Sequence, residues 1–147
     1  MAFRFYKGPN GSTGVASMER FIASGAVTEG LPVKLVAGAS GGEYGKVAVI
    51  AAGSSSADLI YGIAAHSAAD GQEVLVIPAI PGTVWEVDAA ANADVANVMA
   101  DNYLATTTYL LTVGASTAQG KKCHIIGISG AASAKKYLVH LTNVAGI

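Results

Sequence analysis

The feature that most constrains this chain is a series of short apolar and β-branched runs separated by turns rich in glycine, serine and alanine. Such runs, repeated at short intervals, predict strands joined by tight turns. The series indicates an all-β sandwich or barrel. The eight runs from residue 31 onwards are Leu31–Ala37, Gly45–Ala51, Leu59–Ala65, Glu73–Ile77, Thr83–Asp88, Thr107–Val113, Lys122–Ile128 and Lys136–Thr142.

Three segments alternate core-type residues with polar or charged ones: Val33–Leu35, Val84–Asp88 and Tyr137–Leu141. Alternation places one face of a strand on a core and the other in water. A parallel α/β sheet needs about a dozen or more residues between strands, and most gaps here are too short and too rich in glycine. We therefore predict one all-β domain over residues 30–147. It would be a β-sandwich, a jelly-roll-like domain or a small barrel of about eight short antiparallel strands.

Residues 1–29 differ from the rest and are predicted to form an N-terminal arm or a first pair of strands. They hold too few large apolar residues for a core of their own. We therefore expect them to become ordered against the main domain or against another subunit. A run of turn formers follows the aromatic and basic cluster at the start of this segment. We predict that intersubunit contacts are made by Phe3, Arg4, Phe5, Tyr6 and Lys7.

The alanine-rich segment 88–101 is the exception to the strand pattern. Alanine is the best helix former, and Asp88 suits an N-cap position. Val95, Val98 and Met99 would then share one face of a short helix or helical turn. The alternative is a long crossover loop between two sheets.

The charge content excludes several classes of protein. Hydrophobic residues make up 52% of the 147 residues, which excludes a disordered chain. Charged residues make up 13% and the net charge is -1, so neither nucleic acid nor an anionic membrane is an expected partner. A free-standing small domain carries about 25–35% charged surface residues, and this chain falls short of that fraction. We therefore expect it to associate with other subunits.

Cys123 is the single cysteine, which excludes an internal disulfide framework and a multi-cysteine metal cluster. We expect a free thiol in a protein made in a reducing cytoplasm. The first residues lack the apolar stretch of a signal peptide, and none is expected.

The three histidines are candidates for catalytic or metal-binding groups. His66 and Asp70 lie four residues apart, but their surroundings are typical of a strand end and an Asp-Gly turn. Cys123 and His124 are neighbours in a predicted strand, so their side chains point to opposite faces and cannot form a catalytic pair. His140 alternates with core-type residues and is expected at the surface or at a subunit contact.

Other motifs of catalysis are incomplete. Ser129 stands close to a nucleophile elbow, but the second glycine, Gly130, comes one residue too early. No phosphate-binding loop is present, and the carboxylates do not cluster as glycoside or metal chemistry requires. We predict no catalytic, cofactor-binding or metal-binding residues and no enzyme.

Trp85 is the only tryptophan, and it lies in an alternating strand beside Glu86. Buried tryptophans contribute large apolar area, so we interpret Trp85 as an anchor for the core or for a subunit interface. Stacking on a ligand is the alternative.

Two segments carry a resemblance to a known family. Residues 71–87 read Gly-Gln-Glu-Val-Leu-Val-Ile-Pro-Ala-Ile-Pro-Gly-Thr-Val-Trp-Glu-Val, and residues 59–65 read Leu-Ile-Tyr-Gly-Ile-Ala-Ala. With the order of strands and turns from Leu31 onwards, they resemble small capsid decoration (cement) proteins of tailed bacteriophages. The resemblance implies a β-sandwich or jelly-roll-like domain on the capsid exterior of the virion. There it would bind the major capsid protein and cement neighbouring subunits.

Two other functions stay open at this point. Another phage structural component, such as a tail or head fibre protein, would share this composition. A small ligand-binding β-barrel or enzyme would instead need a pocket, for which His66, Asp70 and Ser129 are the candidate residues. For the structural functions we expect a homo-oligomer, either a dimer or a trimer.

Overall fold

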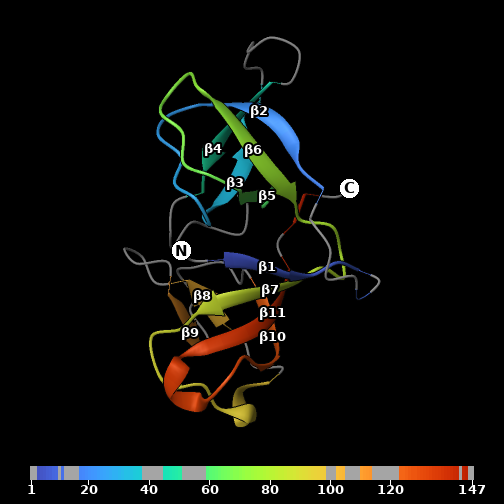
Figure 1. Ribbon diagram of the computed structural model, residues 1–147, viewed down its shortest axis with the longest axis vertical. Coiled ribbons are helices and arrows are strands. Elements are labelled where there is room, and N and C mark those ends of the chain that lie inside the picture. The colour runs from blue at the N-terminus through green and yellow to red at the C-terminus, as the bar shows by residue number, and fades with distance from the viewer. Residues whose placement is uncertain are drawn as a thin grey trace.

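The computed structural model describes residues 3–9, 11, 17–37, 45–50, 59–98, 102–104, 110–113, 123–142 and 144–145. Apart from two 3-10 helices, every regular element in these ranges is a strand, so the predicted all-β class is confirmed. The strands form a closed barrel, a four-stranded sheet and a two-stranded sheet. Figure 1 shows the barrel at the top and the four-stranded sheet below it.

The barrel closes in the strand order β2-β4-β3-β5-β6. Its pairs are antiparallel except for β2 and β4, which run parallel, whereas the sequence predicted antiparallel strands throughout. Strand β2 pairs with both β4 and β6 and so closes the ring, which leaves no edge of the barrel sheet open. The bounds are Glu19–Ala23 for β2, Pro32–Leu35 for β3, Lys46–Val49 for β4, Gly62–Ala64 for β5 and Glu73–Pro78 for β6.

The four-stranded sheet is antiparallel and has the strand order β1-β7-β11-β10. Each of the eight predicted runs contains one observed strand, while β1, β2 and β8 are additional. The bounds are Phe3–Lys7 for β1, Val84–Asp88 for β7, Asn102–Leu104 for β8, Leu111–Val113 for β9, Cys123–Ile128 for β10 and Lys136–Leu141 for β11. Strands β8 and β9 form the two-stranded sheet.

The N-terminal strands are built into the body of the chain. Strand β1 pairs with β7, and Phe3 donates its backbone N–H to the carbonyl of Gly30 at 3.0 Å. Strand β2 pairs with β4 and β6 inside the barrel, where Ala23 is fully buried. Strands from both sides of residue 29, the predicted boundary of the arm, therefore share one barrel. The physical reason is that β1 and β2 each bury apolar side chains that the sheets require.

In the described part of the segment predicted as a helix over 88–101, residues 88–98, the only helical element is one short 3-10 turn. Asp88 ends strand β7, and Ala89 forms a bridge with Leu111. A single 3-10 turn, η1 at Val95–Asn97, is capped by the Asp94 carboxylate, which accepts a hydrogen bond from the backbone N–H of Ala96 at 2.9 Å. The predicted helical turn thus exists but is shorter, and Asp88 is not its N-cap. Met99 lies outside the described residues.

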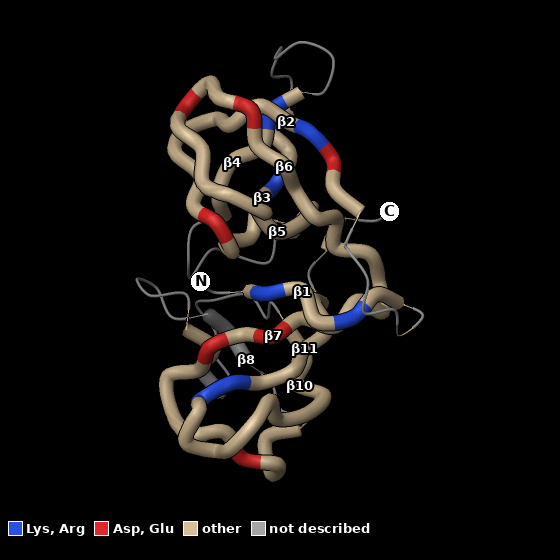
Figure 2. Tube along the Cα trace, viewed as in Figure 1, with Lys and Arg blue, Asp and Glu red and all other residues tan. Residues whose placement is uncertain are grey.

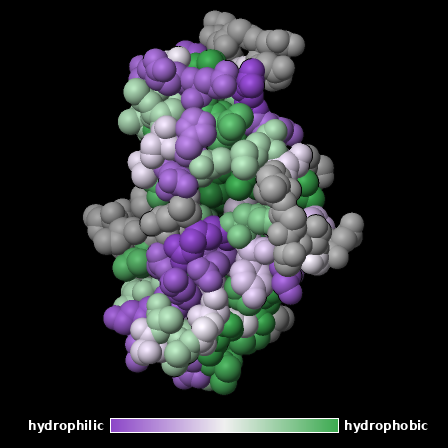
Figure 3. Space-filling model, viewed as in Figure 1, coloured by the Kyte–Doolittle hydropathy of each residue, from purple (hydrophilic) through white to green (hydrophobic). Residues whose placement is uncertain are grey.

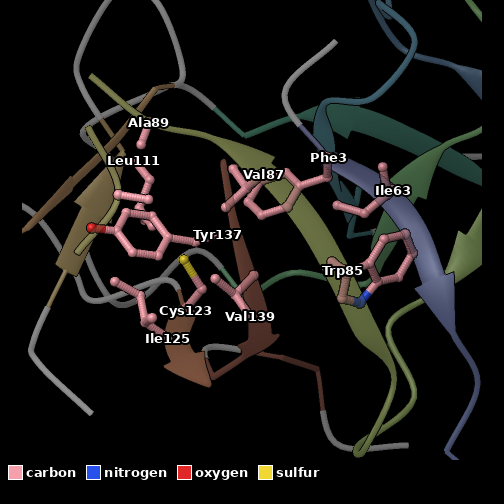
Figure 4. Close-up of a cluster of buried hydrophobic side chains, with 11 residues drawn as sticks. Phe3, Ile63, Trp85, Val87, Ala89, Leu111, Cys123, Ile125, Tyr137 and Val139 are labelled. Carbon is pink, nitrogen blue, oxygen red and sulfur yellow. The ribbon is translucent and has the colours of Figure 1, made fainter. Parts of the chain in front are cut away.

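The main core cluster joins the sheet to the barrel. Ile63 of β5 packs there with Phe3 of β1 and Trp85 of β7 (Figure 4). Since Ile63 is a barrel residue, this contact fixes the barrel on the sheet. The buried members are Phe3, Ile63, Trp85, Val87, Ala89, Ala93, Leu111, Cys123, Ile125, Tyr137 and Val139. A second cluster of smaller side chains fills the barrel interior.

Gly62 offers a test of barrel packing. A Cβ atom at this position would lie 2.4 Å from the carbonyl oxygen of Ile77 and 2.6 Å from Cγ1 of Val76. We expect Gly62→Ala to lower the free energy of unfolding by about 3 kcal/mol, because backbone on the neighbouring strand must move. Gly127→Ala is the matched control, since a Cβ there would meet no atom within 4 Å. Urea unfolding measures both variants, and similar losses would contradict the proposed packing constraint.

Candidate interaction surface

The outer face of the four-stranded sheet carries a compact group of charged side chains. Arg4 projects from β1, Glu86 and Asp88 from β7, and Lys136 from β11. They share this face because residues of one strand alternate between its two sides, and Trp85 and Val87 face the core. Figure 2 shows the resulting order of basic, acidic and basic strands across β1, β7 and β11.

Arg4 binds both carboxylates of β7. The strand register places Arg4 directly opposite Glu86, and the distance from Arg4 Nε to Glu86 Oε1 is 2.7 Å. Its other two nitrogens reach Asp88, with Nη2 to Oδ1 at 2.7 Å and Nη1 to Oδ2 at 3.3 Å. Charge-assisted contacts from a planar guanidinium fix both position and orientation. Arg4 therefore fastens β1 to β7 from outside, opposite the buried Phe3.

Two further groups complete the network around Glu86. The Ser129 hydroxyl donates to Glu86 Oε2 at 2.5 Å, and Lys136 Nζ lies 3.8 Å from Oε1. The charges of the two basic groups, Arg4 and Lys136, thus balance those of the two carboxylates. The face is polar without excess charge, and Figure 3 shows hydrophilic side chains gathered at mid-height on the visible side. A partner docking here would meet hydrogen-bonding groups and no strong net field.

The network shifts the acid-base equilibria of its members. Hydrogen bonding to Arg4 lowers the pKa of Asp88 despite partial burial. Burial alone would raise the pKa of Glu86, but hydrogen bonds from Ser129 and Arg4 lower it below its usual value. Hydrogen bonding to Asp88 raises the pKa of Arg4. Each of these shifts favours the charged form of Arg4, Glu86 or Asp88 at neutral pH.

The structure separates the five predicted contact residues into two groups. Phe3 has 1% of its surface exposed and is occupied in the chain's own core, and Phe5 stacks edge-on against Trp85 with ring centroids 6.0 Å apart. Tyr6 is 41% exposed, and the Lys7 ammonium lies 5.6 Å from the centre of its ring. Arg4 is half-buried in the ionic network. Tyr6, with Lys7 beside it, is therefore the most accessible of the five for an intersubunit contact, which stays a prediction.

Trp85 lies in the core of this chain with 1% of its surface exposed. Its ring packs near Ile63 and Phe3, where the sheet meets the barrel (Figure 4). The predicted alternative of ligand stacking would need an exposed ring face, which the structure does not offer.

Of the three residues proposed for a pocket, two lie at the barrel and the third lies at the four-stranded sheet. His66 accepts a hydrogen bond from the backbone N–H of Leu75 at 3.1 Å, and Asp70 accepts one from the backbone of Gly25 at 2.8 Å, both at the barrel. Ser129 is bound to Glu86 on the sheet. Two cavities bordered by described residues each have about 160 Å³, below the ~300 Å³ lower range of small-molecule sites.

Two searches of the described residues were negative. They hold no group of three or more His, Cys, Asp or Glu side chains arranged to bind a metal ion. They also contain no helix long and apolar enough to cross a membrane.

Comparison with known proteins gave a likeness to a solved structure. No family model and no curated protein matches the chain. Among solved structures, the chain resembles one described as the head fiber gp8.5 N base in bacteriophage phi29. The TM-score is 0.52 at 10% sequence identity, over 90% of this chain and 99% of that one. The two share a fold. The likeness covers the arrangement of strands over nearly the whole chain. At 10% identity it shows the fold alone.

The charged network can be tested by removing its arginine. Arg4→Met keeps the aliphatic stem but leaves two carboxylates without their main partner. We expect a loss of about 2 kcal/mol in the free energy of unfolding, between exposed and fully buried ion pairs. Arg20→Met is the control, because its pair with Glu73 is more than half exposed and should contribute about 0.5 kcal/mol or less. Equal losses in denaturant titrations would show that the network adds no stability.

The same network predicts an acid-dependent stability. Because the folded-state pKa values of Glu86 and Asp88 are lowered, their contribution is present above the unfolded-state values. It is lost as pH falls from about 4.5 through the folded-state values. We expect the stability difference between the native chain and Arg4→Met to shrink over this range. Urea unfolding of both proteins at pH 7, 5, 4 and 3 measures this difference. The salt concentration is held at ~0.1 M because salt screens charges. A difference independent of pH would contradict the assignment.

Proposed function

We propose that this chain is a structural component of a phage head and not an enzyme. The observation that carries the proposal is the fold likeness to a phage head fiber base over nearly the full length of both chains. A fold alone does not define a function, so the argument also uses the surface. The described residues place the candidate pocket groups apart, and the chain has few charges to keep copies separate. Both features favour a protein that works through contacts with other subunits.

We propose further that the chain acts on the outside of the head, bound to the major capsid protein. A barrel and a sheet that share one buried core suit a rigid attachment. Cementing of neighbouring capsid subunits is the finer form of this proposal. Many copies held at fixed positions would bind the shell tightly even if each single contact is weak, because a high effective concentration raises the overall avidity. A dimer or trimer of this chain at a capsid symmetry axis fits the same arrangement.

A tail location is the competing assignment within the same class. The likeness to a head fiber base favours the head. Separating heads from tails and locating the protein in one fraction by antibody distinguishes the two. Recovery only with tails would overturn the head assignment while leaving a structural function.

Binding to capsids is the central prediction. Purified chain mixed with capsids of the same phage that lack it should bind saturably in co-sedimentation. It should also raise the capsid melting temperature, because a ligand specific for the intact shell stabilises it by mass action. Binding without a rise in melting temperature would support attachment but contradict cementing. An absence of binding at micromolar concentrations would contradict both.

The contact residues can be tested in the same assay. Tyr6→Ala removes an exposed aromatic ring next to Lys7, and exposed tyrosines often contribute most to interfaces. We expect roughly tenfold weaker capsid binding. Leu35→Ala is the matched control, an exposed apolar residue on the barrel strand β3. An equal loss of capsid affinity in both variants, or unchanged affinity in both, would contradict a role for the β1 end.

A further inference from the structure

Two of the three histidines face each other across adjacent strands. The register of β10 and β11 pairs His124 directly with His140. Cys123, Ile125 and Val139, their neighbours in the chain, are fully buried in the core. Because successive side chains of a strand point to opposite faces, both imidazoles lie on the outer face of the sheet. Both residues are only partly buried, so this face remains accessible to a small ion.

We propose that His124 and His140 form a two-imidazole site for a borderline divalent metal ion such as Zn²⁺ or Ni²⁺. Directly opposed residues have Cβ atoms about 4.5–5.5 Å apart. Two nitrogens that each bind zinc at about 2.0–2.1 Å in tetrahedral geometry lie roughly 3.3 Å apart. The required distance between the nitrogens is shorter than the distance between the Cβ atoms, and the two imidazoles can reach it by converging toward one ion. The pair therefore has the spacing of a chelating site without a change in the backbone.

The donor atoms decide which ions are suitable. Imidazole nitrogen favours Zn²⁺, Ni²⁺ and Cu²⁺, whereas Mg²⁺ and Ca²⁺ prefer oxygen. The carboxylates on the same face, Glu86 and Asp88, are already bound by Arg4. The buried Cys123 thiol faces the opposite side of the sheet. Two histidines alone leave coordination positions open, and these are available to water or to a donor from a neighbouring subunit.

A structural role for the pair makes a different prediction. If His124 and His140 only cover the sheet surface, divalent metal ions should leave stability unchanged. If they chelate, the ion binds the paired histidines of the folded chain more tightly than the separate histidines of the unfolded chain, so it raises the melting temperature. The proposal does not depend on the phage assignment, because the binding is measured on the isolated chain.

Titration of the full chain with NiCl₂ and ZnCl₂ at neutral pH tests the site, with MgCl₂ as the oxygen-preferring comparison. Calorimetry should give saturable binding of Ni²⁺ or Zn²⁺ and none of Mg²⁺, and the melting temperature should rise only with the first two. Changing a group that only hydrogen-bonds to a metal ligand weakens metal sites about 10–100-fold, so losing a ligand itself should cost at least that. His124→Gln and His140→Gln should each therefore weaken binding by roughly tenfold or more.

His66→Gln is the matched control, because His66 lies in a turn of the barrel and bonds to Leu75. Its affinity for Ni²⁺ should stay at the native value. Unchanged affinity in either sheet variant, an equal loss in His66→Gln, or no binding of Ni²⁺ or Zn²⁺ at millimolar concentration would each overturn the proposal. Circular dichroism of every variant without metal separates a lost site from a lost fold.

Discussion

The burial of strand β1 is the constraint on which the rest of this structure depends. Phe3 enters the core next to Ile63 and Trp85, where the barrel and the sheet meet. The next residue, Arg4, faces outward and holds a carboxylate 82 positions further along the chain. Because adjacent residues of a strand face opposite sides, one short segment fixes both the interior contact and the outer ionic network. Losing this segment would open the sheet edge and expose the joint with the barrel.

The sequence was informative where the signal is local. Each of the eight runs carries its own apolar pattern and its own bordering turns, and each contains a strand. The closure of the barrel was not readable, because the parallel pairing of β2 with β4 depends on contacts between distant segments. The same holds for β1, whose partner β7 lies far along the chain. The alanine-rich segment misled for a different reason: its backbone groups bond to other segments, as Ala93 does to Ala132, and this outweighs helix propensity.

The candidate site shows the same limit at the level of single residues. Glu86 and Asp88 are recognisable as neighbours on one strand face, but nothing local indicates that Arg4 binds both. The facing histidines depend on one irregularity, the register shift between Ile125 and Gly127. Without that shift, His140 would stand opposite Ile125, whose side chain enters the core. A bulge of this kind turns every side chain beyond it to the other face, and it cannot be read from strand composition.

The likeness to a fiber base at 10% identity indicates the architecture of this chain but does not identify its binding partner. A barrel and a sheet of small and β-branched residues can be built from many sequences that keep volume and alternation. Specificity must then come from exposed groups. Here the charged face balances two cations with two anions, so long-range attraction contributes little and fit at contact decides binding. An assembly that holds many copies in fixed geometry favours such a surface, because avidity supplies what each weak contact lacks.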